Sequence, residues 1–131
     1  PLKPSIYANL LAEKLAQHQT HVWLLNTGWS GGGYGVGKRI ALPLTRAMIS
    51  AVLSDQLNNV ETHRHPIFNL DIPDEVEGVP QNVLNPELAW TDQAAYQREA
   101  LQLAHRFAEN FKKYEKTVLP EVSAAGPRVA L

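Results

Sequence analysis

The sequence predicts an α/β fold in which a mixed sheet is flanked by helices, and three observations support this. An amphipathic stretch over residues 4–18 is followed by a continuous apolar run at residues 22–25, which is the order of a helix and a buried strand. A second helical pattern, from residue 43 to 53, precedes a stretch with strand-like alternation at residues 60–73. Helices that alternate with short strands are typical of α/β proteins.

Composition indicates one globular domain. The 131 residues include 44% hydrophobic and 19% charged side chains and no cysteine, which excludes thiol catalysis and cysteine-ligated metal sites. The net charge of −1 argues against a nucleic-acid partner, and no apolar run approaches the ~20 residues that span a membrane. We therefore expect a cytoplasmic protein. Because the chain begins with Pro1 and its only methionine is Met48, we also expect a fragment or a trimmed product.

The N-terminal third is expected to form a helix and then a strand. Pro4 or Ser5 can begin the helix, because the first turn tolerates proline and a serine hydroxyl can cap it. An apolar stripe then continues to about His18. The run Val22–Leu25 is too short for a helix, so we interpret it as a buried strand of the kind found in parallel sheets.

A glycine-rich loop follows, because six of the eight glycines lie between Asn26 and Lys38. Glycine allows positive φ and a close approach of backbone N–H groups to a ligand. The spacing Gly32–Lys38 matches a phosphate-binding P-loop, but Arg39 stands where that motif needs Ser or Thr to bind magnesium. A true P-loop is therefore not expected.

The same region is locally positive. From Thr27 to Ser54 the chain carries Lys38, Arg39 and Arg46 and no acidic residue. Such cations beside flexible amides suit a phosphate or carboxylate, whereas the alternative is a solvated hairpin whose cations serve solubility. We expect Thr45 to have a structural role on its helix. The alternative is that its hydroxyl contacts a ligand beside Arg39.

The C-terminal half is expected to be mainly helical after the extended stretch. Pro43 can open a helix that ends near Leu53, residues 74–90 are expected to form an ordered surface loop, and the tail from Glu115 is expected to be loop. Thr91 and Asp92 can cap the longest helix. Its expected core residues recur every three or four positions: Tyr96, Ala100, Leu103, Phe107, Phe111 and Tyr114.

The sequence gives little support for a metal site or for acid–base catalysis. His63 and His65 lie on one face of an expected strand, but two ligands are too few for a metal site without a third. Asp74, Glu75 and Glu77 are interpreted as a solvated acidic turn rather than a catalytic carboxylate pair. We therefore assign no catalytic and no metal-binding residue.

Several motifs, taken together, resemble one enzyme family. The run Asn26–Ile40, followed by Thr45-Arg46-Ala47, is similar to the C-terminal part of ATP-dependent phosphoenolpyruvate carboxykinases. The resemblance continues in the same order through further segments and covers nearly the whole chain. These segments are Glu61-Thr62, Pro66–Leu70, Ile72-Pro73, Gly78-Val79, Leu84–Pro86, Phe107–Tyr114 and Ala124–Pro127.

The resemblance implies a fold and a reaction. It places residues 1–131 as a single C-terminal segment of the mononucleotide-binding lobe of a phosphoenolpyruvate carboxykinase-like fold. Family members convert oxaloacetate and ATP to phosphoenolpyruvate, CO2 and ADP in gluconeogenesis, with Mg2+ and usually Mn2+. By the same resemblance, Arg39 and Ile40 match positions that contact the adenosine portion of ATP, and Thr45 matches a further nucleotide contact. Arg39 would use its guanidinium plane and donors, and Ile40 its backbone and an apolar wall.

The family's catalytic parts lie upstream of this segment. The Gly-Lys-Thr phosphate loop, the metal ligands and the substrate arginine of the family are not found in the 131 residues. Because phosphoryl transfer needs cations at the transferred group, we expect the isolated chain to be inactive and to require the remainder of the enzyme chain. The alternatives are a freestanding, non-catalytic nucleotide- or anion-binding module and a small P-loop kinase, the latter disfavoured by Arg39.

Overall fold

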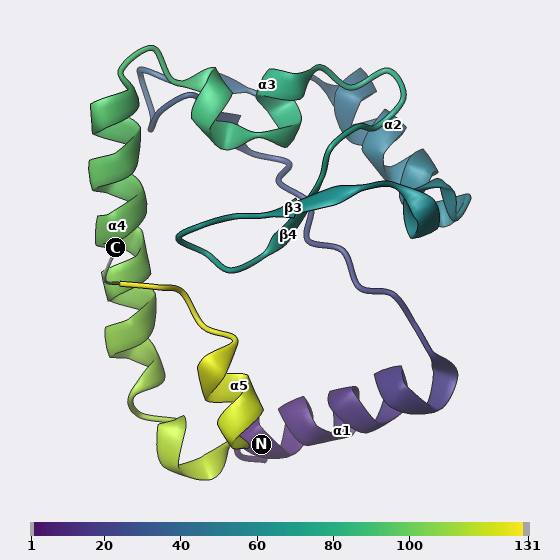
Figure 1. The fold of residues 1–131 in the computed structure, drawn as a ribbon, viewed down its shortest axis with the longest axis vertical. Helices are drawn as coiled ribbons and strands as arrows, with labels where there is room; N and C mark the ends of the chain where they lie inside the picture. The colour runs from purple at the N-terminus through teal and green to yellow at the C-terminus, as the bar shows by residue number, and fades with distance from the viewer. Residues whose placement is uncertain (1, 130–131) are drawn as a thin grey trace.

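The computed structural model describes residues 2–129 and contains helices and two separate antiparallel strand pairs (Figure 1). In chain order the elements are α1 (Pro4–His18), β1 (Trp29–Ser30), β2 (Lys38–Arg39), α2 (Leu42–Leu53), the 3-10 turn η1 (Gln56–Asn59), β3 (Thr62–Arg64), β4 (Asp71–Pro73), α3 (Gln81–Leu84), η2 (Pro86–Ala89), α4 (Gln93–Phe111), η3 (Glu115–Thr117) and α5 (Pro120–Ala124). The expectation of helices mixed with strands is confirmed. The expectation of one mixed sheet is wrong, because within the described residues each pair closes locally as a hairpin.

The expected strand Val22–Leu25 is absent from the part of the chain that the structure describes. The segment is irregular, and Val22 and Leu24 are 61% and 80% exposed. A strand requires a neighbour to pair its N–H and C=O groups, and no backbone hydrogen bond within residues 2–129 involves residues 21–25. The apolar run therefore predicted a strand for which the described residues supply no partner.

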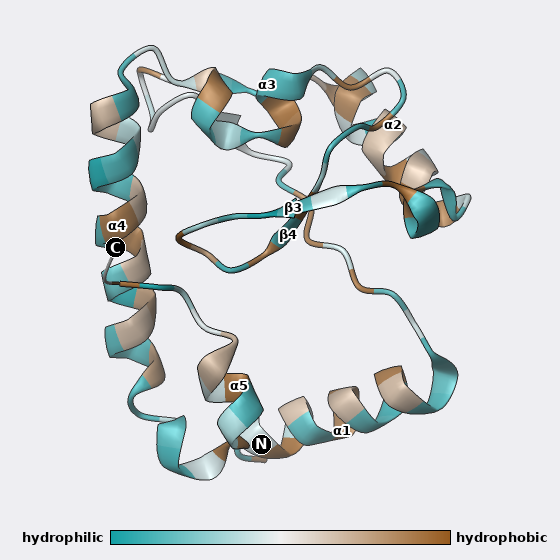
Figure 2. Ribbon diagram, in the orientation of Figure 1, coloured by the Kyte–Doolittle hydropathy of each residue, from teal (hydrophilic) through white to brown (hydrophobic). Residues whose placement is uncertain are grey.

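Helix α1 forms as expected but packs little. Pro4 occupies its first turn, and Gln19 ends it in the left-handed conformation with φ 49°. None of its residues is buried, and Ile6 and Leu10 of its apolar stripe are 40% and 48% exposed. Apolar residues recur along this helix in Figure 2, while Figure 1 shows it at one edge of the molecule.

Two small hydrophobic clusters form the core. Helix α2 ends at the expected Leu53 and contributes Met48 and Ala51 to the first cluster, which also contains Leu57, Val76 and Val79. The second cluster consists of Ile67, Tyr96, Ala100 and Ala104. The β3–β4 hairpin crosses the space between α4 and α2 in Figure 1 and contributes Ile67 from its loop to the second cluster.

Helix α4 is capped as expected, but its buried face differs from the expected one. Asp92 Oδ1 accepts a hydrogen bond from the Ala95 N–H at 2.9 Å. Tyr96 and Ala100 are buried, but Leu103 and Phe107 are 44% and 52% exposed. The small, fully buried Ala104 continues the i, i+4 row from Ala100 and lets the Ile67 loop approach closely, so the helix rests on that row rather than on its larger side chains.

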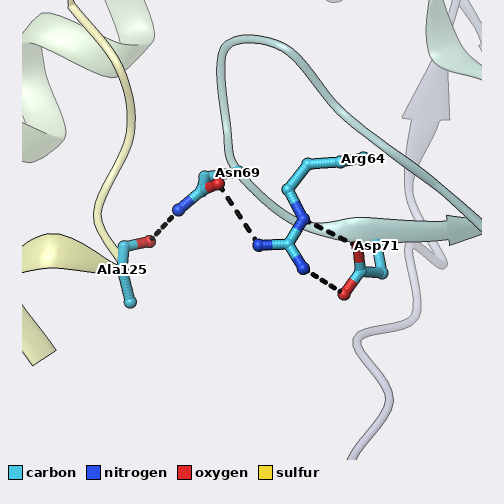
Figure 3. A network of polar contacts seen from close by, with 4 residues as sticks. All are labelled: Arg64, Asn69, Asp71 and Ala125. Atoms are coloured by element: carbon cyan, nitrogen blue, oxygen red, sulfur yellow. Dashed lines mark hydrogen bonds and ion pairs between the residues drawn. The ribbon is translucent and has the colours of Figure 1, made fainter. Parts of the chain in front are cut away.

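The extended stretch at residues 60–73 folds back on itself, with Thr62, His63 and Arg64 opposite Pro73, Ile72 and Asp71. Arg64 holds Asp71 with two hydrogen bonds of 2.8 Å. Asn69, with φ 57°, donates from Nδ2 to the Ala125 carbonyl at 3.3 Å and joins this hairpin to the tail (Figure 3).

The segments expected to be loop contain short helices. Residues 74–90 include α3 and η2, and the tail includes η3 and α5. Pro120 stands in the first turn of α5, where a missing N–H costs nothing, so the expectation of loop after Glu115 is wrong there. Within residues 2–129, no helix combines the length and apolarity needed to cross a membrane.

Candidate nucleotide site

The glycine-rich loop is the tip of the β1–β2 hairpin. Trp29 pairs with Arg39 and Ser30 with Lys38, so residues 31–37 reverse the chain direction. A P-loop instead connects a strand directly to a helix, and the hairpin therefore agrees with the absence of its Ser or Thr. Gly31, with φ +77°, touches η2: a Cβ at this position would lie 2.6 Å from the Ala89 carbonyl oxygen.

The side chain of Asn26 fixes the base of this hairpin. Its Oδ1 accepts from the Gly28 N–H at 2.9 Å, and its Nδ2 donates to the Trp29 carbonyl at 3.1 Å. On the other side of the base, the Ile40 N–H donates to the Gly28 carbonyl at 2.9 Å. These bonds hold Trp29 and Arg39 in their pairing.

The two faces of the hairpin differ. Side chains of consecutive strand residues point to opposite faces, so Arg39 and Ile40 lie on different sides. Ile40 packs against the Met48 cluster, whereas Arg39 is exposed. The hairpin therefore rests on the core through Ile40 and presents Arg39 on its outer face.

Thr45 lies in the first turns of α2, directly after the hairpin. It is 9% exposed, and its N–H donates to the Ala41 carbonyl at 3.2 Å. The N-terminal end of α2 has no side-chain cap and no acidic residue in its first turn. The positive end of the helix dipole is therefore left uncompensated beside Arg39.

The cations of this region have no carboxylate partner in the described structure. No ion pair between residues 2 and 129 includes Lys38, Arg39 or Arg46, although Arg64 pairs with Asp71. All three side chains are exposed. Their charge is thus available to an anionic ligand.

Two surface cavities lie away from Arg39, Ile40 and Thr45. One, of about 570 Å³, separates the hairpin tip at Gly32 and Gly33 from α4 at Tyr96 and Arg106. The other, of about 510 Å³, lies between the end of α4 and the tail and is mainly apolar. Arg39, Ile40 and Thr45 lie along one short segment outside both cavities, but only Arg39 is exposed, because Ile40 packs against the core and Thr45 is buried.

His63 and His65, the two candidate metal ligands, have other partners. His63 Nδ1 lies 2.6 Å from Asp74 Oδ1 on the surface. His65 is buried: its Nδ1 accepts from the Ile67 and Phe68 N–H groups at 3.1 Å, and its Nε2 contacts Tyr96 Oη at 2.7 Å. Among residues 2–129, no three potential metal-ligating side chains cluster.

Burial lowers the pKa of His65, with a smaller opposing effect from Glu87 and a smaller lowering effect from His63. Burial also raises the pKa of Tyr96, and Glu87 adds to that rise. The sequence offered no signal for this pair, because its partners are 31 positions apart. Both groups are therefore held neutral within the core.

Comparison with known proteins points to one family. The sequence model described as phosphoenolpyruvate carboxykinase matches residues 1–82. The chain is 52% identical over 128 residues to phosphoenolpyruvate carboxykinase (ATP) from Caldanaerobacter subterraneus subsp. tengcongensis and 50% identical over 128 residues to that from Thermus thermophilus. Each alignment covers 98% of this chain and 24% of the relative.

A third relative, phosphoenolpyruvate carboxykinase (ATP) from Bacillus cytotoxicus, is 50% identical over 127 residues, which are 97% of this chain and 24% of the relative. The chain thus spans about a quarter of the length of the curated relatives it matches. The resemblance noted from the glycine-rich run and the segments after it is confirmed. The chain belongs to the ATP-dependent phosphoenolpyruvate carboxykinase family.

Proposed function

We propose that this chain supplies the adenosine side of the ATP site in a phosphoenolpyruvate carboxykinase, through Arg39, Ile40 and Thr45. Residues 1–131 would form a single C-terminal segment of its mononucleotide-binding lobe. The observation that carries the proposal is the exposed Arg39, which has no carboxylate partner within the described residues, beside the uncapped start of α2. A guanidinium in this setting is free to bind a ligand of opposite charge or a flat ring.

Each residue has a distinct part. Arg39 offers a planar cation and several donors to the base or the ribose. The Ile40 N–H is already donated to Gly28, so Ile40 contributes its carbonyl oxygen and the exposed edge of its side chain. Thr45 contributes from the first turns of α2, where the helix dipole favours the negative charge of the nucleotide.

The complete enzyme would convert oxaloacetate and ATP to phosphoenolpyruvate, CO2 and ADP, a reaction of gluconeogenesis in the cytoplasm. Mg2+ and Mn2+ would supply charge stabilisation at the transferred phosphoryl group. The residues described here do not fit either ion, because His63 is paired with Asp74 and both ring nitrogens of His65 are occupied. The metal ligands would therefore belong to the remainder of the chain, and the isolated segment would be inactive.

The proposal is tested by Arg39→Ala in the full-length carboxykinase that carries this segment. We expect binding of ATP and of adenosine to weaken roughly 10- to 150-fold, the usual range for one charge-assisted contact, while binding of tripolyphosphate stays within about twofold. Isothermal titration calorimetry with the three ligands measures this. Arg98→Ala, which removes an exposed arginine from α4, is the matched control and should leave all three affinities unchanged.

The alternative function is a freestanding anion-binding module without catalysis. The uncapped α2 start and the exposed cations Arg39 and Arg46 favour it, since they suit any phosphate or carboxylate. If this alternative holds, Arg39→Ala should weaken the binding of tripolyphosphate as much as the binding of ATP. Adenosine should then show no measurable binding to the unchanged protein or to the variant. Unchanged affinity for all three ligands would contradict both functions.

A further inference from the structure

We infer that Trp29 is a second nucleobase-binding side chain and forms, together with Arg39, one platform for the adenine ring of ATP. The inference rests on the proposed function and adds a residue to the same site. It begins from the pairing of the two residues across the β1–β2 hairpin.

The hydrogen bonds of the hairpin place the two side chains close together. In an antiparallel ladder, pairs that exchange hydrogen bonds alternate with pairs that do not, and side chains of the second kind lie closer. The Ile40 N–H donates to the Gly28 carbonyl, so Gly28 and Ile40 form a bonded position. The next pair, Trp29 and Arg39, is therefore a non-bonded pair whose side chains share one face.

That face is the open one. Trp29 is 46% exposed, which is high for the largest apolar side chain. The other two tryptophans have packing roles, since Trp23 packs against the Met48 cluster and Trp90 against the Ile67 cluster. Trp29 belongs to neither cluster, so core packing among residues 2–129 does not account for a tryptophan at this position.

The backbone of Trp29 is held in place, and its indole has one aromatic neighbour. The Trp29 carbonyl accepts from Asn26 Nδ2, and the indole makes an edge-to-face contact with Tyr34, itself 92% exposed, at 5.6 Å between centroids and 72° between planes. An indole that shares a hairpin face with a guanidinium offers a base both a stacking surface and a cation over its π system. Neither group needs to contact the phosphate chain, so the platform would bind the adenosine part of the nucleotide.

The test compares Trp29→Leu, Trp29→Phe and Arg39→Ala in the full-length carboxykinase, with Phe107→Leu, an exposed aromatic residue of α4, as the matched control. Loss of one base-stacking ring should raise KM for ATP roughly 5- to 20-fold and weaken adenosine binding alike, with tripolyphosphate binding unchanged. Trp29→Phe keeps an aromatic face and should stay within about twofold of the unchanged protein. Trp29→Phe should also remove nucleotide-induced quenching of tryptophan emission, which gives a readout in a variant that preserves the packing around the hairpin.

The outcomes separate the two claims. If Arg39→Ala raises KM for ATP while Trp29→Leu does not, the platform is wrong and the proposed function stands. If neither variant changes KM for ATP, the proposed function fails and the platform fails with it. If Trp29→Leu weakens the binding of tripolyphosphate as strongly as the binding of adenosine, the quenching experiment decides. Nucleotide-induced quenching that is retained in Trp29→Phe would then overturn the inference.

Discussion

His65 joins three parts of the structure through one buried ring. Because Nδ1 accepts two backbone N–H groups, the proton of the neutral ring lies on Nε2, which donates to Tyr96 Oη. The same loop is tied to the tail, since the Arg128 N–H donates to the Ile67 carbonyl at 2.7 Å. Protonation of Nδ1 would remove the acceptor for both Ile67 and Phe68.

We expect this loop to loosen as the pH falls below about 6.5, the ordinary pKa of histidine. Burial lowers the pKa of His65 in the folded state, so between that lowered pKa and 6.5 the unfolded chain binds more protons. The stability that His65 contributes is therefore complete above 6.5 and is lost as the pH falls through the folded-state pKa. Hydrogen exchange of the Ile67 and Phe68 amides, corrected for the intrinsic rate, measures the loss.

His105→Gln removes an exposed histidine from α4 and should leave this pH dependence in place. His65→Gln should remove the pH dependence and lower the protection of the Ile67 and Phe68 amides at every pH. Protection of Ile67 and Phe68 that stays constant between pH 7.5 and 5 in the unchanged protein would contradict this role of His65.

At single positions, the sequence predicted the exposed cations but not their surroundings. The absence of acidic residues near Arg39 was visible in the sequence, and the structure adds that no partner reaches it from elsewhere in residues 2–129. The burial of His65 against Tyr96 depends on how two distant segments pack. A local pattern carries no information of that kind. The roles of Arg39, Ile40 and Thr45 toward ATP stay predictions.

At the scale of elements, the glycines of the β1–β2 hairpin differ in the space that a Cβ atom would have. Gly31 has φ +77° and a Cβ there would meet the Ala89 carbonyl, whereas Gly33 has no atom within 4 Å of the corresponding point. We expect Gly31→Ala to cost about 1–3 kcal/mol through backbone strain and the clash with η2, and Gly33→Ala to be within about 0.5 kcal/mol of neutral. Urea denaturation of the two variants measures this difference.

Gly35→Ala separates strain from the clash, because Gly35 has φ +86° but open space around it. The stability of Gly35→Ala should fall between the stabilities of Gly31→Ala and Gly33→Ala. Equal stability of Gly31→Ala and Gly33→Ala would show that the hairpin does not touch η2 as described.

Helices were predicted better than strands for a physical reason. The bounds of α2 and the Asp92 cap of α4 follow from proline, capping side chains and apolar spacing within one segment. Strands need a partner, so the extended stretch at residues 60–73 became a hairpin and Val22–Leu25 remained unpaired. Of the expected core of α4, Tyr96 and Ala100 are buried but Leu103 and Phe107 are exposed. Two apolar rows, through Ala104 and through Phe107, both fit the helical period, so the period alone does not distinguish them.

At the scale of the whole molecule, the described chain leaves much apolar surface open. No residue of α1 is buried, and Val22 and Leu24 are exposed on the segment that follows it. Exposed apolar surface of this extent marks an interaction site. Since the chain spans 24% of the length of its relatives, we expect the remainder of a carboxykinase chain to cover this surface.

We propose that the adenosine part of ATP lies against the β1–β2 hairpin and the start of α2. Photolabelling of the full-length carboxykinase with 8-azido-ATP, followed by peptide mapping, tests it most directly. We expect the label within residues 28–46, which include Trp29, Arg39 and Thr45, and we expect excess ATP to suppress it. An ATP-protected label found only outside residues 28–46, for example on the α4 side of the 570 Å³ cavity, would contradict the claim.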